Sequence, residues 1–411
     1  MAGVIPGVVE QHAQEAAFLW LLRDIAVLAP HYALADLADL DRRVEAHLDG
    51  LRIAGDDGVR ACQRQLGEKE PGEVFAAAVL AFDSADRAQI TAVIEVAAAL
   101  PELSRGLVSA LGWLPYPRAR GAIQGLTAGQ SPALRRVAIA GCVAHRQDPG
   151  LGLDRALFDP DPRLRARALR AVGELGRKDR VPELLEHFKA AEPECRFAAA
   201  WSAALLGERK AASVLRTIAE AGGPLDDRAA AMAIRRMSPQ EARDWLDDLV
   251  ARPEHRRLAV IGAGVLGDPA RIPWLLSFMS APDLARVASQ SFSMITGIDL
   301  SFERLDGASP KAIRPRPSDD AEDADVAMDP DDNIPWPEPG VIQAWWARHQ
   351  GEFLRGRRYL LGKPILAPFL ADALARGQQR QRAAAALELA ILRPGQPLFE
   401  VRAPGFRQAV S

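Results

Sequence analysis

The apolar residues of this chain recur at helical spacing in units of about 30 residues, and a proline marks the start of each unit. These prolines follow one another at intervals of 29 to 31 residues: Pro71, Pro101, Pro132, Pro162, Pro193, Pro224, Pro253 and Pro282. Proline is tolerated in the first turn of a helix because the N–H that it lacks would have no partner there. The spacing therefore predicts a helix that begins at or near each proline.

The positions after each proline repeat as well. The sixth residue is alanine in seven of the eight units, and residues seven, ten and thirteen are mostly apolar. This pattern forms one stripe of an α-helix, on which alanine lets a neighbouring helix approach closely. Gly176, Gly207 and Gly267 lie where a helix C-terminus favours a left-handed backbone. A second amphipathic segment completes each unit, for example residues 180–190 and 271–281.

Two short helices cannot bury their apolar stripes alone, so successive pairs must stack on one another. We therefore predict an all-α fold, an α-solenoid of about eight helix-pair repeats with a continuous core. Residues 14–29 and 37–55 do not keep the repeat interval and are predicted to be helices. They are expected to form an atypical N-terminal cap that covers the first apolar face.

The composition changes after the repeats. From Ser318 to Asp332 there are eight acidic residues and no basic ones, so this block is expected to be an exposed or mobile linker. Helices are predicted from Val341 onward and over residues 377–392, before a tail rich in proline and glycine. The predicted domains are a helical cap (1–70), a repeat solenoid (71–302), an acidic linker (303–340) and a small helical region (341–411).

Most units carry a basic residue three or four positions after the proline. These residues are Arg105, Arg135, Arg136, Arg165, Arg196, Arg228, Arg256, Arg257 and Arg286. A nucleic-acid surface is one explanation, but the chain has a net charge of −3, and residues 159–176 set four arginines against three acids. We expect these arginines to bond mostly to acids or backbone of adjacent units, and we do not expect nucleic acid as a partner.

One string imitates a catalytic motif. Residues 262–267, GAGVLG, fit the glycine pattern of dinucleotide-binding loops letter for letter. That site needs the glycines between a β-strand and the start of a helix, whereas this string is in register with residues 171–176 and ends a helix. The histidines and cysteines show no metal-ligand spacing, and no nucleophile motif occurs. The sequence therefore predicts a protein that is not an enzyme and that uses no cofactor or metal ion.

Tryptophans gather after the acidic block. They could pack the C-terminal helices against the end of the solenoid, or they could form an interaction hot spot. The predicted partner-binding residues are Trp336, Trp345, Trp346, Arg357, Arg358 and Tyr359.

The cysteines and the N-terminal residues indicate the cellular compartment of the protein. Three widely spaced cysteines, Cys62, Cys142 and Cys195, predict no disulfide framework and favour a reducing compartment. The first fifteen residues lack a basic region followed by an apolar run, and no uncharged apolar stretch approaches ~18 residues. We expect a cytoplasmic protein with no membrane span.

The repeat units resemble HEAT-like repeats of the short, phycobilisome-lyase type. The resemblance rests on the opening D-P-x-x-R-x-x-A and the close A-x-x-L-G, found here in DPDPRLRARALRAVGELG. Over most of its length the chain also resembles a proteobacterial family associated with type VI secretion gene clusters. The matching stretches are residues 29–55, FSMITGIDL, IPWPEPGVIQAWW, GRRYLLGKPI and QRQRAAAALELAIL.

The second resemblance implies an accessory protein near secreted toxins and their spike proteins, and it carries over no catalytic residue. We therefore expect a scaffold that binds another protein, most specifically an immunity protein that neutralises a type VI effector. An adaptor or chaperone that loads an effector or spike protein is the nearest alternative. Other classes remain open: HEAT-like repeats also form DNA glycosylases, which need a basic concave channel, bilin lyases and self-associating structural subunits.

Overall fold

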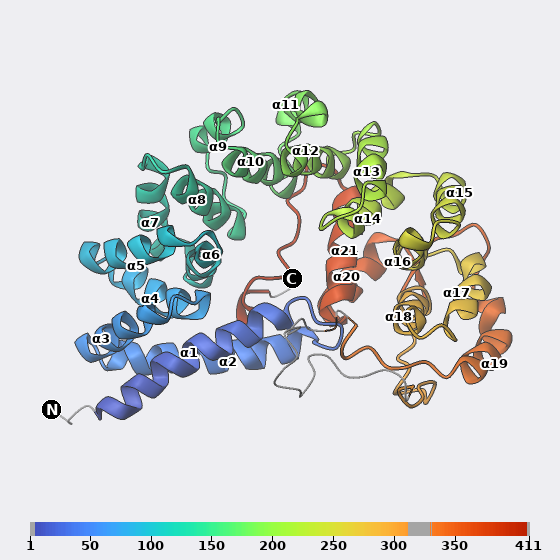
Figure 1. The fold of residues 1–411 in the computed structure, drawn as a ribbon, viewed down its shortest axis with the longest axis horizontal. Helices are drawn as coiled ribbons and strands as arrows, with labels where there is room; N and C mark the ends of the chain where they lie inside the picture. Colours follow the sequence, from blue (N-terminus) through green and yellow to red (C-terminus); the bar gives the residue numbers. More distant parts are fainter. Residues whose placement is uncertain (1–4, 311–328, 330, 409–411) are drawn as a thin grey trace. The chain divides into compact units, whose positions relative to one another are not determined.

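The computed structural model describes residues 5–310, 329 and 331–408, and its helices pack against their neighbours in pairs (Figure 1). The chain divides into two compact units: unit 1 is Met1–Gly207 with Arg393–Ser411, and unit 2 is Glu208–Leu392. Stacked helix pairs build both units, which confirms the predicted all-α solenoid. The four-domain division expected from the sequence stays a prediction.

In unit 1, the helices α1, α4, α6, α8, α10 and α12 pack each on the next, and the remaining helices lie beside them. The α-helices are α1 (Pro6–Ala26), α2 (Leu34–Ile53), α3 (Asp56–Gln65), α4 (Pro71–Ser84), α5 (Arg87–Ala99), α6 (Ser104–Trp113), α7 (Tyr116–Ala128), α8 (Pro132–Ala144), α9 (Leu151–Ala156), α10 (Pro162–Glu174), α11 (Val181–Glu186) and α12 (Pro193–Leu205). Short 3₁₀ turns are η1 (Leu66–Glu68), η2 (Pro101–Leu103), η3 (Lys178–Arg180), η4 (His187–Lys189) and η8 (Gly405–Arg407).

In unit 2, α14, α16 and α18 stack in the same way, with α13, α15 and α17 beside them. The elements are α13 (Ala211–Glu220), α14 (Asp226–Arg236), α15 (Pro239–Val250), η5 (Pro253–His255), α16 (Arg256–Leu266), η6 (Pro269–Arg271), α17 (Ile272–Phe278), α18 (Ala285–Thr296), α19 (Pro339–His349), η7 (Gln350–Glu352), β1 (Tyr359–Leu360), β2 (Lys363–Pro364), α20 (Ala367–Arg376) and α21 (Gln379–Leu392). The antiparallel pair β1–β2 was not predicted, because strands of two residues show no alternating pattern.

The repeat prolines begin helices in three ways. Four of them are the first residue of α4, α8, α10 and α12, as predicted. Pro101 and Pro253 open a 3₁₀ turn that leads into the helix. Pro224 and Pro282 stand two or three residues before α14 and α18. The recurrent alanine after each proline is buried in every unit that has it, which places the predicted stripe in the core.

Two of the polar residues that directly precede a repeat proline cap their helix with the side chain, and a third does not. The Asp161 carboxylate accepts a hydrogen bond from the N–H of Leu164 at 2.8 Å, and the Ser131 hydroxyl caps α8 in the same way. Glu192 makes no cap with its side chain. Its carboxylate pairs instead with Arg165 at 3.1 Å.

In both units, neighbouring repeats approach one another closely where a glycine meets a serine. Gly173 of α10 faces Ser202 of α12, and Gly264 of α16 faces Ser291 of α18. Each serine hydroxyl donates to a carbonyl of the glycine's helix, at 2.8 Å for Ser202 and 2.9 Å for Ser291. A Cβ on Gly173 would lie 2.7 Å from the Cα of Ser202, and one on Gly264 would lie 2.9 Å from that of Ser291. Both units therefore use one device to bring two backbones together.

In unit 1, the C-terminal tail, residues 393–408, runs across the ends of several stacked helices. The N–H of Leu398 donates to the carbonyl of Glu174, at the end of α10, at 2.9 Å. Arg407 donates to the carbonyl of Leu114, just after α6, at 3.1 Å. The last carbonyls of a helix have no partner within the helix, so the tail satisfies groups that would otherwise need water.

In unit 2, the β1–β2 hairpin donates hydrogen bonds to carbonyl groups at the ends of α16 and α18. The N–H of Tyr359 donates to the carbonyl of Gly267 at 2.7 Å, and the N–H of Leu361 donates to that of Met294 at 2.8 Å. Gly267 has a φ of +69° and ends α16, as the sequence predicted.

Candidate partner-binding surfaces

Five of the repeated arginines bond to neighbouring units or to the loop before their own helix, as predicted. Three form ion pairs: Arg105–Asp24 at 2.9 Å, Arg135–Asp159 at 3.1 Å and Arg165–Glu192 at 3.1 Å. Two donate to neutral oxygens: Arg136 to the Ser104 hydroxyl at 3.0 Å and Arg196 to the Ala190 carbonyl at 3.1 Å. These side chains therefore contribute to the packing of the solenoid.

The last two arginines in the series, Arg257 and Arg286, hold part of the acidic block. Arg257 donates two hydrogen bonds to the Asp331 carboxylate, at 2.7 and 2.5 Å. Arg286 donates to the carbonyl of Asp331 at 3.0 Å, pairs with Asp329, and stacks 4.7 Å from the ring centre of Trp336. The hydrogen bonds to Asp331 raise the pKa of Arg257. Asp331 is only 6% exposed, so the expected exposure of the acidic block does not hold there, because two arginines compensate the charge. Residues 311–328 of the predicted linker lie outside the described residues.

We expect Asp331→Asn to loosen this attachment, because an amide cannot accept both charge-assisted bonds from Arg257. The cost should be about 1–2 kcal/mol, and hydrogen exchange should become faster over residues 331–337. Asp332→Asn is the matched control, since the Asp332 side chain is exposed. Equal exchange rates in the two variants would contradict the assigned role of Asp331.

The predicted aromatic residues mostly face the interior of unit 2. Trp345 of α19 makes an edge contact with Phe292 of α18, with ring centres 5.7 Å apart. Trp346 packs on Phe353, which in turn packs on Tyr359. Trp345, Trp346 and Tyr359 are buried, so a partner could touch their rings only if this packing opened.

The other three predicted residues have different surroundings. Arg358 pairs with the buried Glu388 at 2.7 Å and donates to the carbonyl of Leu266 at 2.9 Å. Trp336 is half-buried beneath Arg286, and Arg357 is exposed. The structure therefore brings Trp345, Trp346 and Tyr359 together in the core and leaves Trp336 and Arg357 nearest the solvent.

An apolar stripe on α1 was missed by the sequence analysis. Four large side chains on one face of the helix are exposed, Phe18 57%, Leu21 39%, Leu22 37% and Ile25 61%, and Leu28 in the turn after the helix is 62% exposed. Residues three and four positions apart lie on the same face of a helix, so these side chains form one stripe. The opposite face of α1 is also apolar and is buried in the core of unit 1, so the exposed stripe is a second apolar face of the same helix. A continuous exposed stripe of this kind is typical of an interaction site.

Toward its C-terminal end, α10 carries a largely buried charged cluster. The Glu174 carboxylate accepts hydrogen bonds from Arg167 at 2.7 Å and from Arg170 at 2.8 Å. Burial alone would raise the pKa of Glu174, but the two arginines bring it down to about 2. The Arg170 guanidinium stacks 4.6 Å from the ring centre of Trp201 on α12.

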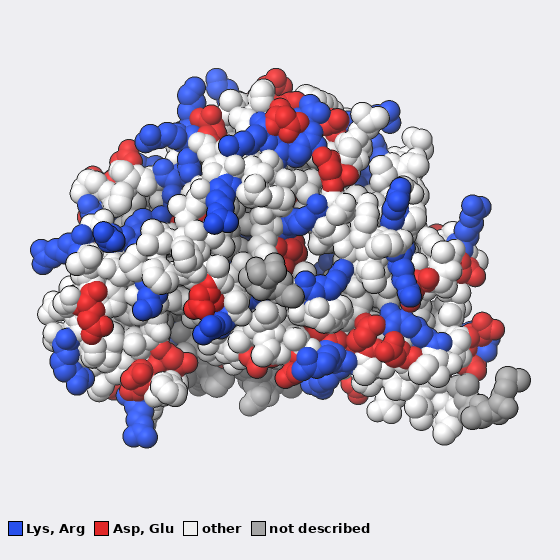
Figure 2. Space-filling model, turned by 180° about the vertical axis from the view of Figure 1, so that it is seen from behind, with Lys and Arg blue, Asp and Glu red and all other residues white. Residues whose placement is uncertain are grey.

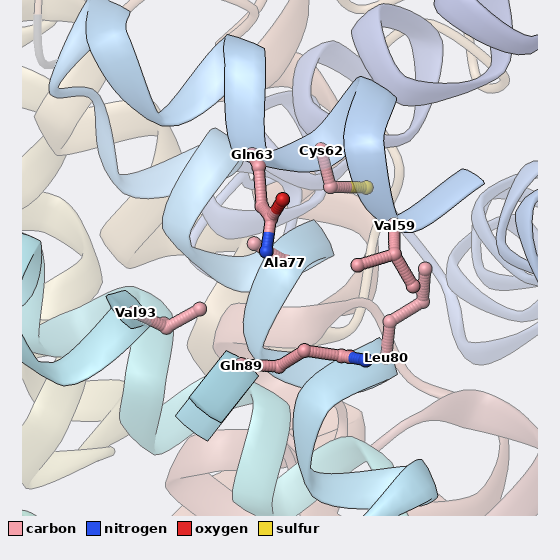
Figure 3. A pocket seen from close by; sticks show the side chains of 7 residues that line it. All are labelled: Val59, Cys62, Gln63, Ala77, Leu80, Gln89 and Val93. Carbon is pink, nitrogen blue, oxygen red and sulfur yellow. The ribbon is translucent and has the colours of Figure 1, made fainter. Parts of the chain in front are cut away.

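Two depressions of the described structure do not form an enclosed site. One, of about 280 Å³, is lined by Arg216, Thr217 and Glu220 of α13 and by Ala221 just after it, so it has no opposing wall. The void in Figure 3, bordered by side chains of α3, α4 and α5, has a volume of about 10 Å³. That is about the space of one water molecule.

The side chains that could support chemistry are buried or dispersed. Burial raises the pKa of the Cys62 thiol to about 12 and that of Cys142 to about 11, so both thiols are unreactive near neutral pH. All three cysteines are free. Within the described part of the chain, no three His, Cys, Asp or Glu side chains are grouped to hold a metal ion.

The GAGVLG string lies inside and at the end of α16, as the sequence analysis concluded. A Cβ on Gly262 would lie 2.6 Å from the Leu246 side chain, and one on Gly267 would lie 2.2 Å from the carbonyl oxygen of Tyr359. Together with the contact of Gly264 on Ser291, this explains all three glycines by close packing.

The surface charge and the hydropathy of the helices bear on the kind of partner. Basic and acidic side chains are interspersed on the face seen in Figure 2, with no broad field of one sign. Among the described helices, none is both long and apolar enough to cross a membrane.

Comparison with known proteins identifies one segment. Residues 153–235 match the HEAT repeats family, and they contain three of the repeat prolines. A comparison with curated proteins found no match. The matched segment and the stacked helix pairs before and after it support the interpretation of this chain as a HEAT-like repeat protein.

Proposed function

We propose that this chain is a cytoplasmic, non-enzymatic scaffold that binds another protein. HEAT-like repeats commonly mediate contacts between proteins. The observation that carries the proposal is the stripe on α1 and the turn after it, where Phe18, Ile25 and Leu28 are each more than half exposed. Burial of such side chains in an interface is favourable by about 25 cal/mol per Å² of apolar surface. A helix already held by its buried face loses little conformational freedom on binding.

The narrower proposal is an immunity protein that binds and neutralises a type VI secretion effector. Its support is the resemblance of stretches such as IPWPEPGVIQAWW and GRRYLLGKPI to a family found near type VI secretion genes. The second candidate is an adaptor or chaperone that loads an effector or spike protein. The net charge of −3 argues against a DNA glycosylase, which needs a basic channel for the nucleic-acid backbone.

Of the residues predicted to bind the partner, we propose Trp336 and Arg357 as direct contacts, because their side chains are nearest the solvent. Trp345, Trp346, Arg358 and Tyr359 would then support them through the packing and ion pair described above.

The first experiment is affinity capture from the native host, with wild-type protein and the double variant Leu22→Lys/Ile25→Lys. Two charges on the stripe should reduce the amount of captured partner at least about tenfold, since charged groups lose hydration in an apolar interface. Gln63→Lys/Gln124→Lys is the matched control, because both glutamines are exposed on other helices of unit 1, α3 and α7.

Equal capture by the stripe variant and the control would remove α1 from the proposal, and capture of no protein by any variant would contradict the scaffold itself.

Deletion of the gene separates the two narrower roles. Self-intoxication that is relieved by deleting a neighbouring toxin gene indicates immunity. Loss of toxin export without self-intoxication indicates an adaptor.

A further inference from the structure

Unit 2 shows what the repeated arginines bind when an acidic chain reaches them. Arg257 and Arg286 each stand four residues after a repeat proline, Pro253 and Pro282. They hold two carboxylates of one segment, Asp331 through two hydrogen bonds and Asp329 through an ion pair. Arg286 also stacks on Trp336, so the attachment combines charge with an aromatic ring.

In unit 1, Arg136 occupies the same position after its own repeat proline, Pro132. Its guanidinium is half-buried, and among the residues that the structure describes its one hydrogen-bond partner is the neutral hydroxyl of Ser104. Burial and the nearby positive charge of Arg163 together lower the pKa of Arg136. This arginine therefore bears a cost of desolvation that no carboxylate compensates through a hydrogen bond.

The neighbouring helix extends this basic surface. Arg163, in the first turn of α10, is exposed and makes no hydrogen bond or ion pair with any described residue. Arg167 lies one turn further along the same helix and shares the Glu174 carboxylate with Arg170. The acids whose charges act on Arg136 are Asp161, whose carboxylate caps α10, and Glu194, which is exposed. Arg170 over Trp201, at 4.6 Å, repeats the geometry of Arg286 over Trp336, at 4.7 Å.

We propose that the surface formed by Arg136, Arg163 and Arg167 on α8 and α10 binds an acidic segment of the partner protein. The inference rests on the proposed scaffold function and names the chemistry of the partner. A polypeptide fits better than a nucleic acid, because the equivalent arginines of unit 2 hold two aspartate carboxylates of one polypeptide segment, those of Asp331 and Asp329. Guanidinium groups bind carboxylates with directional, charge-assisted hydrogen bonds, so a few such contacts suffice for recognition.

The test uses the full chain and a fluorescein-labelled peptide with the sequence of residues 329–337, DPDDNIPWP, followed by fluorescence anisotropy. We expect saturable binding that weakens as salt is raised, and about tenfold weaker binding by Arg136→Gln/Arg163→Gln. Arg42→Gln/Arg60→Gln is the matched control, since these arginines are 66% and 57% exposed on α2 and α3, away from this surface. Circular dichroism melting confirms that each variant is folded, and the peptide NPNNNIPWP measures the part of binding due to charge.

Equal binding of the acidic peptide by the double variant and the control would overturn the proposal. So would a 20-nucleotide single-stranded DNA that binds more tightly than the peptide and loses affinity in the same double variant, because the surface would then serve phosphates. Affinity capture separates this inference from the proposed function. Partner capture that is unchanged in Arg136→Gln/Arg163→Gln leaves the scaffold standing and removes this surface. Peptide binding without any captured partner leaves this surface standing and contradicts the scaffold function.

Discussion

Replacing Glu174 by glutamine should lower the free energy of unfolding of unit 1 by about 3 kcal/mol at pH 7. The carboxylate is 8% exposed and compensates Arg167 and Arg170, which it contacts at 2.7 and 2.8 Å. Glutamine has nearly the same shape but no charge, so two partly buried guanidinium groups would lose their counter-ion. Urea unfolding followed by circular dichroism measures the difference. Glu102→Gln is the control, because Glu102 is exposed.

The pH dependence gives this prediction a second test. The pKa of Glu174 is lowered to about 2 in the folded protein, against an ordinary value of about 4.3. A carboxylate with a lowered folded pKa stabilises the protein fully above the unfolded pKa, and this contribution is lost as the pH falls toward the folded pKa. The stability difference between wild type and Glu174→Gln should therefore be constant from pH 7 to about 5.5, smaller at pH 3 and absent near pH 2. A difference that does not change between pH 7 and pH 3 would show that the effect is not the charge.

The second large effect is that replacing glycine by alanine should destabilise the protein at two positions and stabilise it at a third. Gly173→Ala and Gly264→Ala should each lower the free energy of unfolding by about 1–3 kcal/mol, because the new Cβ would meet the backbone of Ser202 or Ser291. In the interior of an exposed helix the same substitution stabilises by up to about 1 kcal/mol, because alanine has the higher helix propensity. Gly125→Ala on α7 is that control, since nothing lies within 4 Å of its added Cβ.

Urea unfolding of the three glycine variants beside the wild type decides this prediction. Destabilisation by Gly173→Ala and Gly264→Ala with stabilisation by Gly125→Ala would confirm that the helices of both units meet at glycine. If Gly264→Ala proved as stable as Gly125→Ala, the packing explanation of the GAGVLG string would fail. The comparison also tests whether the two units share one stacking device, because Gly173 belongs to unit 1 and Gly264 to unit 2.

Parts of the candidate surfaces were predictable and parts were not. The arginines after each proline were found from their spacing, and most of their structural partners follow from the stacking of adjacent repeats. The stripe on α1 was missed because this helix is apolar on two faces, and residue spacing alone does not tell which face is buried. The tryptophans at 345 and 346 were noticed for their density, but only their contacts with Phe292 and Phe353 show that they lie in the core.

The sequence by itself determined the repeat, the helix pairs and the left-handed glycine that ends a helix. These features are local: a proline without an N–H, an apolar residue every third or fourth position, and a glycine at positive φ act within one or two turns. Tertiary structure alone decided that the acidic block reaches Arg257 and that the tail covers the ends of α6 and α10. Contacts between residues far apart in the chain depend on which surfaces stacking leaves open, and that becomes known only when the repeats are assembled.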